Sequence, residues 1–70
     1  MNQRHTAQDS YHTYLWFRDA AEKGNAYAQF NLGLLYKKGS GVERDERRAF
    51  SWIRLAALQG LAFAQNHLGE

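Results

Sequence analysis

The sequence predicts an all-α protein, built as a short solenoid of helix pairs. The stretch from Trp16 to Gly33 returns 36 residues later, from Trp52 to Gly69, with ten of eighteen positions identical. A period of this length is typical of stacked supersecondary units that bury their apolar faces against each other. Apolar side chains also recur every three or four residues. Proline is absent, so glycine alone interrupts the helical pattern.

Two helices are predicted in the first part of the chain, over residues 9–23 and 26–38. The first is amphipathic, and either Asp9 or Ser10 is expected to cap it. The second is apolar on two sides, which indicates a neighbouring helix on each side. Gly33, in its middle, costs about 1 kcal/mol relative to alanine. We therefore expect another helix to approach closely at this glycine.

Two further helices are predicted over residues 46–59 and 62–69, after a long glycine-containing loop. Asp45 is expected to cap the third helix, as Asp9 does one repeat earlier, and Gly60 to end it. The fourth segment copies the start of the second helix and then stops. Solenoids normally close with a polar cap. We therefore expect that this truncated C-terminal end either frays or is covered by a second copy or another protein.

The composition places the chain in a broad class. Seventy residues allow one domain, predicted over residues 9–70 after a flexible N-terminus over residues 1–8. Cysteine is absent, which excludes disulfides, thiolate metal sites and cysteine nucleophiles. The net charge is only +2, with both signs interspersed, and no apolar run approaches the length of a membrane span. A cytoplasmic location without a cofactor is expected.

The residues also resemble a known repeat family. The string LGLLYKKGSGVERD occupies residues 32–45 and is followed by Ala49, Trp52, Ala56-Ala57, Gly60, Ala64 and Leu68-Gly69. This combination resembles the Sel-one-like (Sel1-like) repeat, a relative of the tetratricopeptide repeat with a longer loop. The resemblance implies a right-handed stack of antiparallel helix pairs. It also implies an adaptor or scaffold, often bacterial, rather than an enzyme.

The resemblance further implies a partner-binding stripe. In related helical repeats, peptides lie along the first helix of each unit, on the side turned away from the packing glycine. The corresponding positions here are Tyr27, Phe30, Leu34, Lys37 and Lys38, with Phe63 and Asn66 in the next copy. Such a stripe suits an amphipathic segment with an acidic end. The alternative is that the two aromatics and the leucine are core residues.

A basic cluster lies near the start of the third helix: Arg44, Arg47 and Arg48. These arginines could contact phosphates or an acidic partner. Acidic residues are interleaved with them, however, and Glu43 can pair with Arg47 four residues later. The pattern therefore favours a solvated face over a nucleic-acid interface.

No catalytic or metal site is predicted. His5, His12 and His67 lack the spacing of a helical metal pair, and the serines lack a nucleophile motif. Trp16 and Trp52 recur at the repeat period beside paired alanines, and we expect them to anchor adjacent layers of the stack.

The sequence thus favours a protein–protein interaction module or adaptor that binds a partner protein, a peptide or itself through helix faces. An alternative is a small inhibitor or regulator that blocks a larger complex. Nucleic-acid binding through the arginine cluster is the third hypothesis, and catalysis has the least support.

Overall fold

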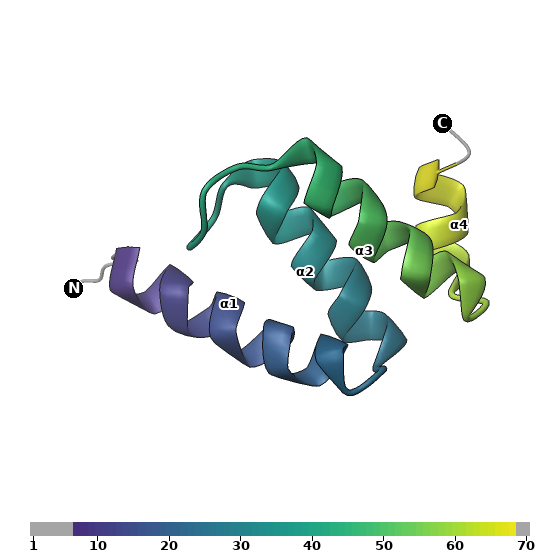
Figure 1. Ribbon diagram of the computed structural model, residues 1–70, viewed down its shortest axis with the longest axis horizontal. Helices are drawn as coiled ribbons and strands as arrows, with labels where there is room; N and C mark the ends of the chain where they lie inside the picture. The colour runs from purple at the N-terminus through teal and green to yellow at the C-terminus, as the bar shows by residue number, and fades with distance from the viewer. Residues whose placement is uncertain (1–6, 69–70) are drawn as a thin grey trace.

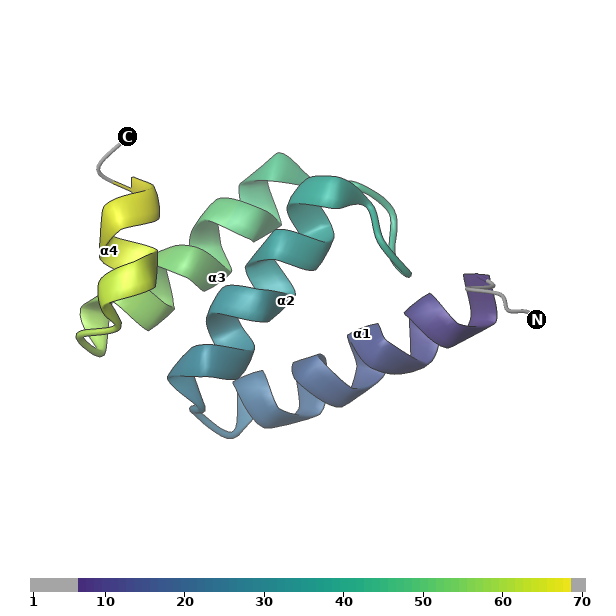
Figure 2. The same ribbon diagram turned by 180° about the vertical axis from the view of Figure 1, so that it is seen from behind.

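Four helices make up the computed structural model, which describes residues 7–68. They are α1 (Ala7–Glu22), α2 (Ala26–Lys38), α3 (Glu46–Leu58) and α4 (Ala62–Leu68). Within that span there is no strand, and no helix is long and apolar enough to cross a membrane. Helix α2 packs between α1 and α3, and α4 packs against α3 (Figures 1 and 2). The predicted all-α stack of helix pairs is confirmed.

The start of α1 differs from the prediction. The helix begins at Ala7, so Asp9 and Ser10 lie inside it and the predicted cap at these residues is wrong. Alanine and glutamine are good helix formers, which lets Ala7 and Gln8 extend the helix backwards. Of the N-terminus predicted to be flexible, residues 1–6 lie outside the described part of the chain.

The other helix ends follow the sequence signals. The Asp45 carboxylate accepts a hydrogen bond from the Arg48 backbone N–H at 3.1 Å, which confirms the predicted cap of α3. Asn25 caps α2 in the same way, through the Ala28 N–H at 2.9 Å. Gly60 follows α3 with φ of 91°, a conformation that glycine adopts without strain.

The long loop between α2 and α3 folds back onto α1. Gly41 has φ of 77°, and a Cβ at this position would clash with the backbone of Ser10 and Tyr11. Only glycine therefore fits this contact. At the end of the loop, the Asp45 N–H donates to the Tyr36 carbonyl at 2.9 Å. In both views the loop reaches from the end of α2 toward the N-terminal half of α1 (Figures 1 and 2).

Two clusters form the core. The first joins α1, α2 and α3 through the buried residues Tyr14, Ala21, Ala28, Leu32, Tyr36 and Ala49. The second joins α3 and α4 through Ile53, Ala56 and Ala64, with α2 residues covering it. Leu32 is completely buried. The two clusters lie on opposite sides of α2, which agrees with its two apolar stripes.

Helices α2 and α3 approach closely at Gly33. A Cβ built on it would lie 2.5 Å from Cγ1 of Ile53 and 2.9 Å from the Ala49 carbonyl oxygen. The expected close approach at this glycine is confirmed. Its repeat counterpart, Gly69, lies outside the described residues.

A glutamine repeats the same bond in both units. Gln29 Nε2 donates to the Ala21 carbonyl at 3.2 Å, and 36 residues later Gln65 Nε2 donates to the Ala57 carbonyl at 3.0 Å. Gln29 is 6% exposed and also accepts from Gln59 Nε2 at 2.8 Å. This side chain therefore ties the α1–α2 corner to the end of α3.

Candidate partner-binding cleft

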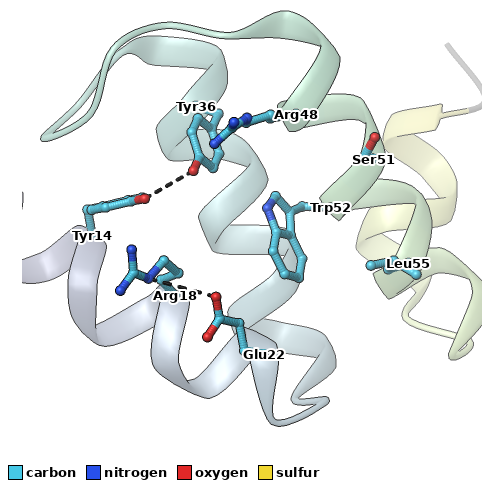
Figure 3. A pocket seen from close by; sticks show the side chains of 8 residues that line it. All are labelled: Tyr14, Arg18, Glu22, Tyr36, Arg48, Ser51, Trp52 and Leu55. Carbon is cyan, nitrogen blue, oxygen red and sulfur yellow. Dashed lines mark hydrogen bonds and ion pairs between the residues drawn. The ribbon is translucent and has the colours of Figure 1, made fainter.

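A cleft of about 430 Å³ opens between α1 and α3, above α2 (Figure 3). Its lining comes from all three helices: Tyr14, Arg18 and Glu22 from α1, Tyr36 from α2, and Arg48, Ser51, Trp52 and Leu55 from α3. Because α2 holds the two outer helices apart, this face of the stack is hollow. The cleft combines cationic, aromatic and aliphatic side chains.

Two tyrosines form one end of the cleft floor. The hydroxyls of Tyr14 and Tyr36 are 3.0 Å apart in a buried hydrogen bond, and the rings meet edge to face with centroids 5.7 Å apart. Both side chains are buried. Burial raises the pKa of Tyr36, the bond to Tyr14 adds to the increase, and the nearby Arg48 opposes it. Tyr36 is therefore a neutral, fixed part of the floor at physiological pH.

Each tyrosine has an arginine over its ring. The guanidinium of Arg18 lies 5.8 Å from the Tyr14 centroid, and that of Arg48 lies 5.9 Å from the Tyr36 centroid. The interaction with Tyr14 raises the pKa of Arg18, and the interaction with Tyr36 raises that of Arg48. The cleft thus carries two permanent positive charges, one from α1 and one from α3.

Both arginines remain available to a ligand. Arg18 pairs with Glu22 at 3.9 Å and Arg48 with Asp45 at 3.5 Å, and in each pair both side chains are well exposed to solvent. Ion pairs between exposed side chains stabilise a fold only weakly, because water screens both charges. A carboxylate of a bound partner can therefore replace the intramolecular one at little cost.

The other end of the cleft is apolar. Trp52 projects from α3 over the first core cluster, and Leu55, 45% exposed, lies one turn further along the helix (Figure 3). Ser51, also exposed, adds a hydroxyl to the α3 side of the cleft. A large apolar side chain of a partner can bury surface here while an acidic group contacts Arg18 or Arg48.

Comparisons with known proteins identify the architecture. The model of the Sel1 repeat matches residues 6–25 and 26–61, which is most of the chain. The chain belongs to the Sel1 repeat family. It is also similar to the crystal structure of a Sel1 repeat protein from Oxalobacter formigenes, with a TM-score of 0.81 and 44% identity. That match covers 84% of this chain and 24% of the other. No curated protein matches the chain.

The matched ranges agree with the helices. The complete Sel1 unit, residues 26–61, holds α2, the long loop and α3, whereas residues 6–25 hold α1 alone. Sel1 repeats are in general protein–protein interaction modules rather than catalytic domains. The cleft between α1 and α3 lies between the second helices of two successive Sel1 units.

The predicted partner-binding stripe of the Sel1 unit is divided in the structure. Phe30 and Leu34 are partly buried against the second core cluster, as the core alternative expected. Tyr27 is 61% exposed and lies on the α1 side. Lys37, Lys38 and Asn66 are exposed, and the side chain of Phe63 lies outside the described part. Binding along this stripe stays a prediction.

The arginine cluster of the Sel1 loop is interleaved with carboxylates, as predicted. Arg44 pairs with Glu46, and Arg48 with Asp45. Arg47 is exposed, and its expected pairing with Glu43 is not found among the described residues. The cluster therefore presents mixed charge to solvent, apart from the side of Arg48 that faces the cleft.

The two tryptophans of the repeat differ in their packing. Trp52 packs against the core cluster that α1 and α2 share, so its predicted role as an anchor between layers is confirmed. Trp16 is 77% exposed, so the same prediction is wrong for Trp16. The reason is positional: Trp52 packs on the layer that α1 and α2 form, whereas no described helix provides such a layer for Trp16.

The histidines of the Sel1 chain form no described site. His12 is exposed on α1, His5 lies outside the described residues, and so does the side chain of His67. Between residues 7 and 68, no group of three potential metal ligands comes together.

Sequence reasoning missed the cleft itself. The helical spacing places Tyr14 on the apolar face of α1, and the charge pattern places Arg48 in a solvated cluster; only the packing of both α1 and α3 against α2 brings the two residues into one pocket. One sequence signal was available, because Arg18 recurs as Arg54 at the repeat period. The arginine two residues after each tryptophan therefore lies on the same face of α1 and of α3.

Proposed function

We propose that this Sel1 repeat chain is a protein-binding module whose cleft captures a segment of a partner that carries an acidic side chain next to a large apolar one. The arrangement of Arg18 and Arg48 above the Tyr14–Tyr36 pair, with Trp52 beside them, carries the proposal. Sel1 repeats generally bind proteins, and this cleft offers both charge and apolar surface.

The chemistry of the cleft sets the partner's features. A guanidinium presents a planar fork of donors, so it recognises a carboxylate with defined geometry. The apolar contact at Trp52 and Leu55 supplies binding energy, because aromatic anchors in interfaces carry most of the affinity. The arginines then set orientation and association rate. An adaptor and a small inhibitor of a larger complex would both use this cleft.

Other classes of function have weaker support. Arg44 is paired with Glu46 and Arg48 with Asp45, which reduces the positive field that nucleic acid requires. A second copy of the chain would be another protein partner, on surfaces that share only Ser51 and Leu55 with the cleft.

Peptide selection on the full chain tests the proposal. A random peptide library displayed on phage is selected against the protein, and the affinity of the recovered peptides is then measured by calorimetry. We expect recovered sequences to combine Asp or Glu with a large apolar residue. Arg48→Gln should weaken their binding about tenfold or more, as the loss of a charge-assisted hydrogen bond does.

Arg47→Gln provides the matched control. This arginine is the neighbour of Arg48 on α3, is exposed, and does not line the cleft. We expect it to leave the affinity nearly unchanged. Equal losses for the two variants would mean that net charge, rather than the cleft, attracts the peptide, and this result would overturn the proposal.

A further inference from the structure

Two exposed apolar patches lie at opposite ends of the helix stack. The first, the Trp16 patch, is a hollow of about 340 Å³ lined by Trp16, Phe17, Ala20, Asn25, Tyr27 and Ala28. Trp16 is the most exposed large apolar residue of the described chain, at 77%. The patch lies on the face of α1 and α2 that points away from α3.

The second patch, the Phe50 patch, lies on α3. Phe50 is 57% exposed and Leu58 is 72% exposed, and with Ser51, Arg54 and Leu55 they line a hollow of about 250 Å³. Phe50, Arg54 and Leu58 follow one another at four-residue intervals, so they share one face of the helix. Single exposed apolar residues are ordinary, but a continuous patch marks an interaction site.

The repeat register shows that the two patches correspond to the two sides of one interface. Trp16 is the counterpart of Trp52, while Phe50 and Arg54 are the counterparts of Tyr14 and Arg18. Inside the chain, Trp52 lines the same cleft as Tyr14 and Arg18 (Figure 3). The α1 helix of a second copy could take the position relative to α3 that α3 itself takes relative to α1. Its Trp16 would then lie beside Phe50 and Arg54.

The first helices of the units fit the same arrangement. Ile53 and Ala56 of α3 pack under Ala26 and Phe30 of α2. Their counterparts on α1 are Phe17 and Ala20, which line the Trp16 patch, and the counterpart of α2 is α4. The incoming α1 would therefore also contact α4, where Ala62 is exposed in the place of Ala26.

From this register we propose that two copies of the chain associate head to tail, with the Trp16 patch of one copy on the Phe50 patch of the next. The intramolecular packing of α3 against α1 and α2 provides the geometry. Because the two patches are different surfaces, the contact is heterologous and each added copy presents a fresh patch. Assembly therefore continues beyond a dimer, either to a ring or to an open stack.

A pair of variants, each with one patch blocked, tests this polarity. Trp16→Lys places a charge in the first patch and Phe50→Lys in the second, and both positions are exposed enough for the fold to tolerate the change. The full chain and each variant are examined by light scattering across concentration, with circular dichroism as the check on folding. Tyr11→Ser, which removes an exposed aromatic outside both patches, is the control.

The outcomes separate the possibilities. We expect the wild-type mass to rise past that of a dimer, both lysine variants to stay monomeric, and their mixture to form a dimer that grows no further. The mixture retains one intact interface, which only a heterologous contact allows. A wild type that stays monomeric would overturn the proposal. So would a mixture of folded variants that fails to dimerise, or the loss of assembly in the Tyr11→Ser control.

Discussion

Gly33 and Ile53 lie where α2 and α3 approach closely, because a Cβ on the glycine would lie 2.5 Å from Cγ1 of the isoleucine. The Ala49 carbonyl oxygen would lie 2.9 Å from the same Cβ. Helix α3 can approach α2 this far only because position 33 has no side chain. The contact fixes the distance of α3 from α2, and with it the width of the cleft between α1 and α3.

Gly33→Ala should therefore destabilise the protein. The substitution gains about 1 kcal/mol of helix propensity, but overpacking against a backbone carbonyl costs about 1–3 kcal/mol. We expect a lower free energy of unfolding in urea. Ser51→Ala, at an exposed position of α3, should change it by no more than about 0.5 kcal/mol. A Gly33→Ala protein more stable than wild type would show that the helices separate easily.

Gln29→Ala should be costly for a different reason. The side chain is buried and makes two hydrogen bonds, to the Ala21 carbonyl and from Gln59. Its removal loses both of these bonds, each worth about 0.5–1.5 kcal/mol, although the Ala21 carbonyl keeps the bond that it accepts from the Gly24 N–H at 3.0 Å. The matched change is Gln65→Ala, because its bond to Ala57 is exposed and water can replace it. If both variants lowered the melting temperature by the same amount, burial would not explain the contribution of the Gln29 hydrogen bonds.

Stability should fall at high pH through Tyr36. Its pKa is raised from 10.0, chiefly by burial, so the folded protein holds this proton more tightly than the unfolded chain does. The stabilisation from Tyr36 is complete below the ordinary pKa of 10.0 that holds in the unfolded chain. It is lost as the pH rises through the higher pKa of the folded protein. The melting temperature should therefore fall as the pH is raised from about 8 to about 11. In Tyr36→Phe it should fall less steeply over the same range.

The Tyr14–Tyr36 hydrogen bond should be visible as a coupling energy. Tyr14→Phe and Tyr36→Phe each remove one hydroxyl of a buried pair whose oxygens are 3.0 Å apart. In a double-mutant cycle we expect a coupling of about 0.5–1.5 kcal/mol, because the second substitution costs little once its partner is absent. Additive losses would mean that the two hydroxyls do not contact each other in solution.

The fold was largely predictable from the sequence because its signals are local. The repeat gave four helices, Asp45 caps α3 as expected, and Gly33 marks the predicted close approach. The sequence does not predict the start of α1, because Asp9, the counterpart of Asp45, follows no glycine-containing loop. The helix therefore extends past Asp9 toward the N-terminus. Local capping signals fail where the flanking residues also favour helix.

The candidate site was harder to predict because it depends on packing. The repeat pattern predicts the same packing role for Trp16 and Trp52. Only Trp52, however, has a layer of helices to pack against. The cleft needs Arg18 and Arg48, from two helices that meet only through α2. A repeat pattern specifies which face a residue occupies, but the neighbours of that face depend on how many layers are stacked.

The two tryptophans provide the most direct test of the proposed binding cleft. Their indole N–H groups give separate signals in a ¹H–¹⁵N spectrum, with Trp52 in the cleft and Trp16 on the opposite face of α1. The measurement is a titration of the full chain with a selected acidic peptide, at a protein concentration where the chain is monomeric. We predict a saturable shift of the Trp52 signal while the Trp16 signal stays in place. A shift confined to Trp16 would contradict the account.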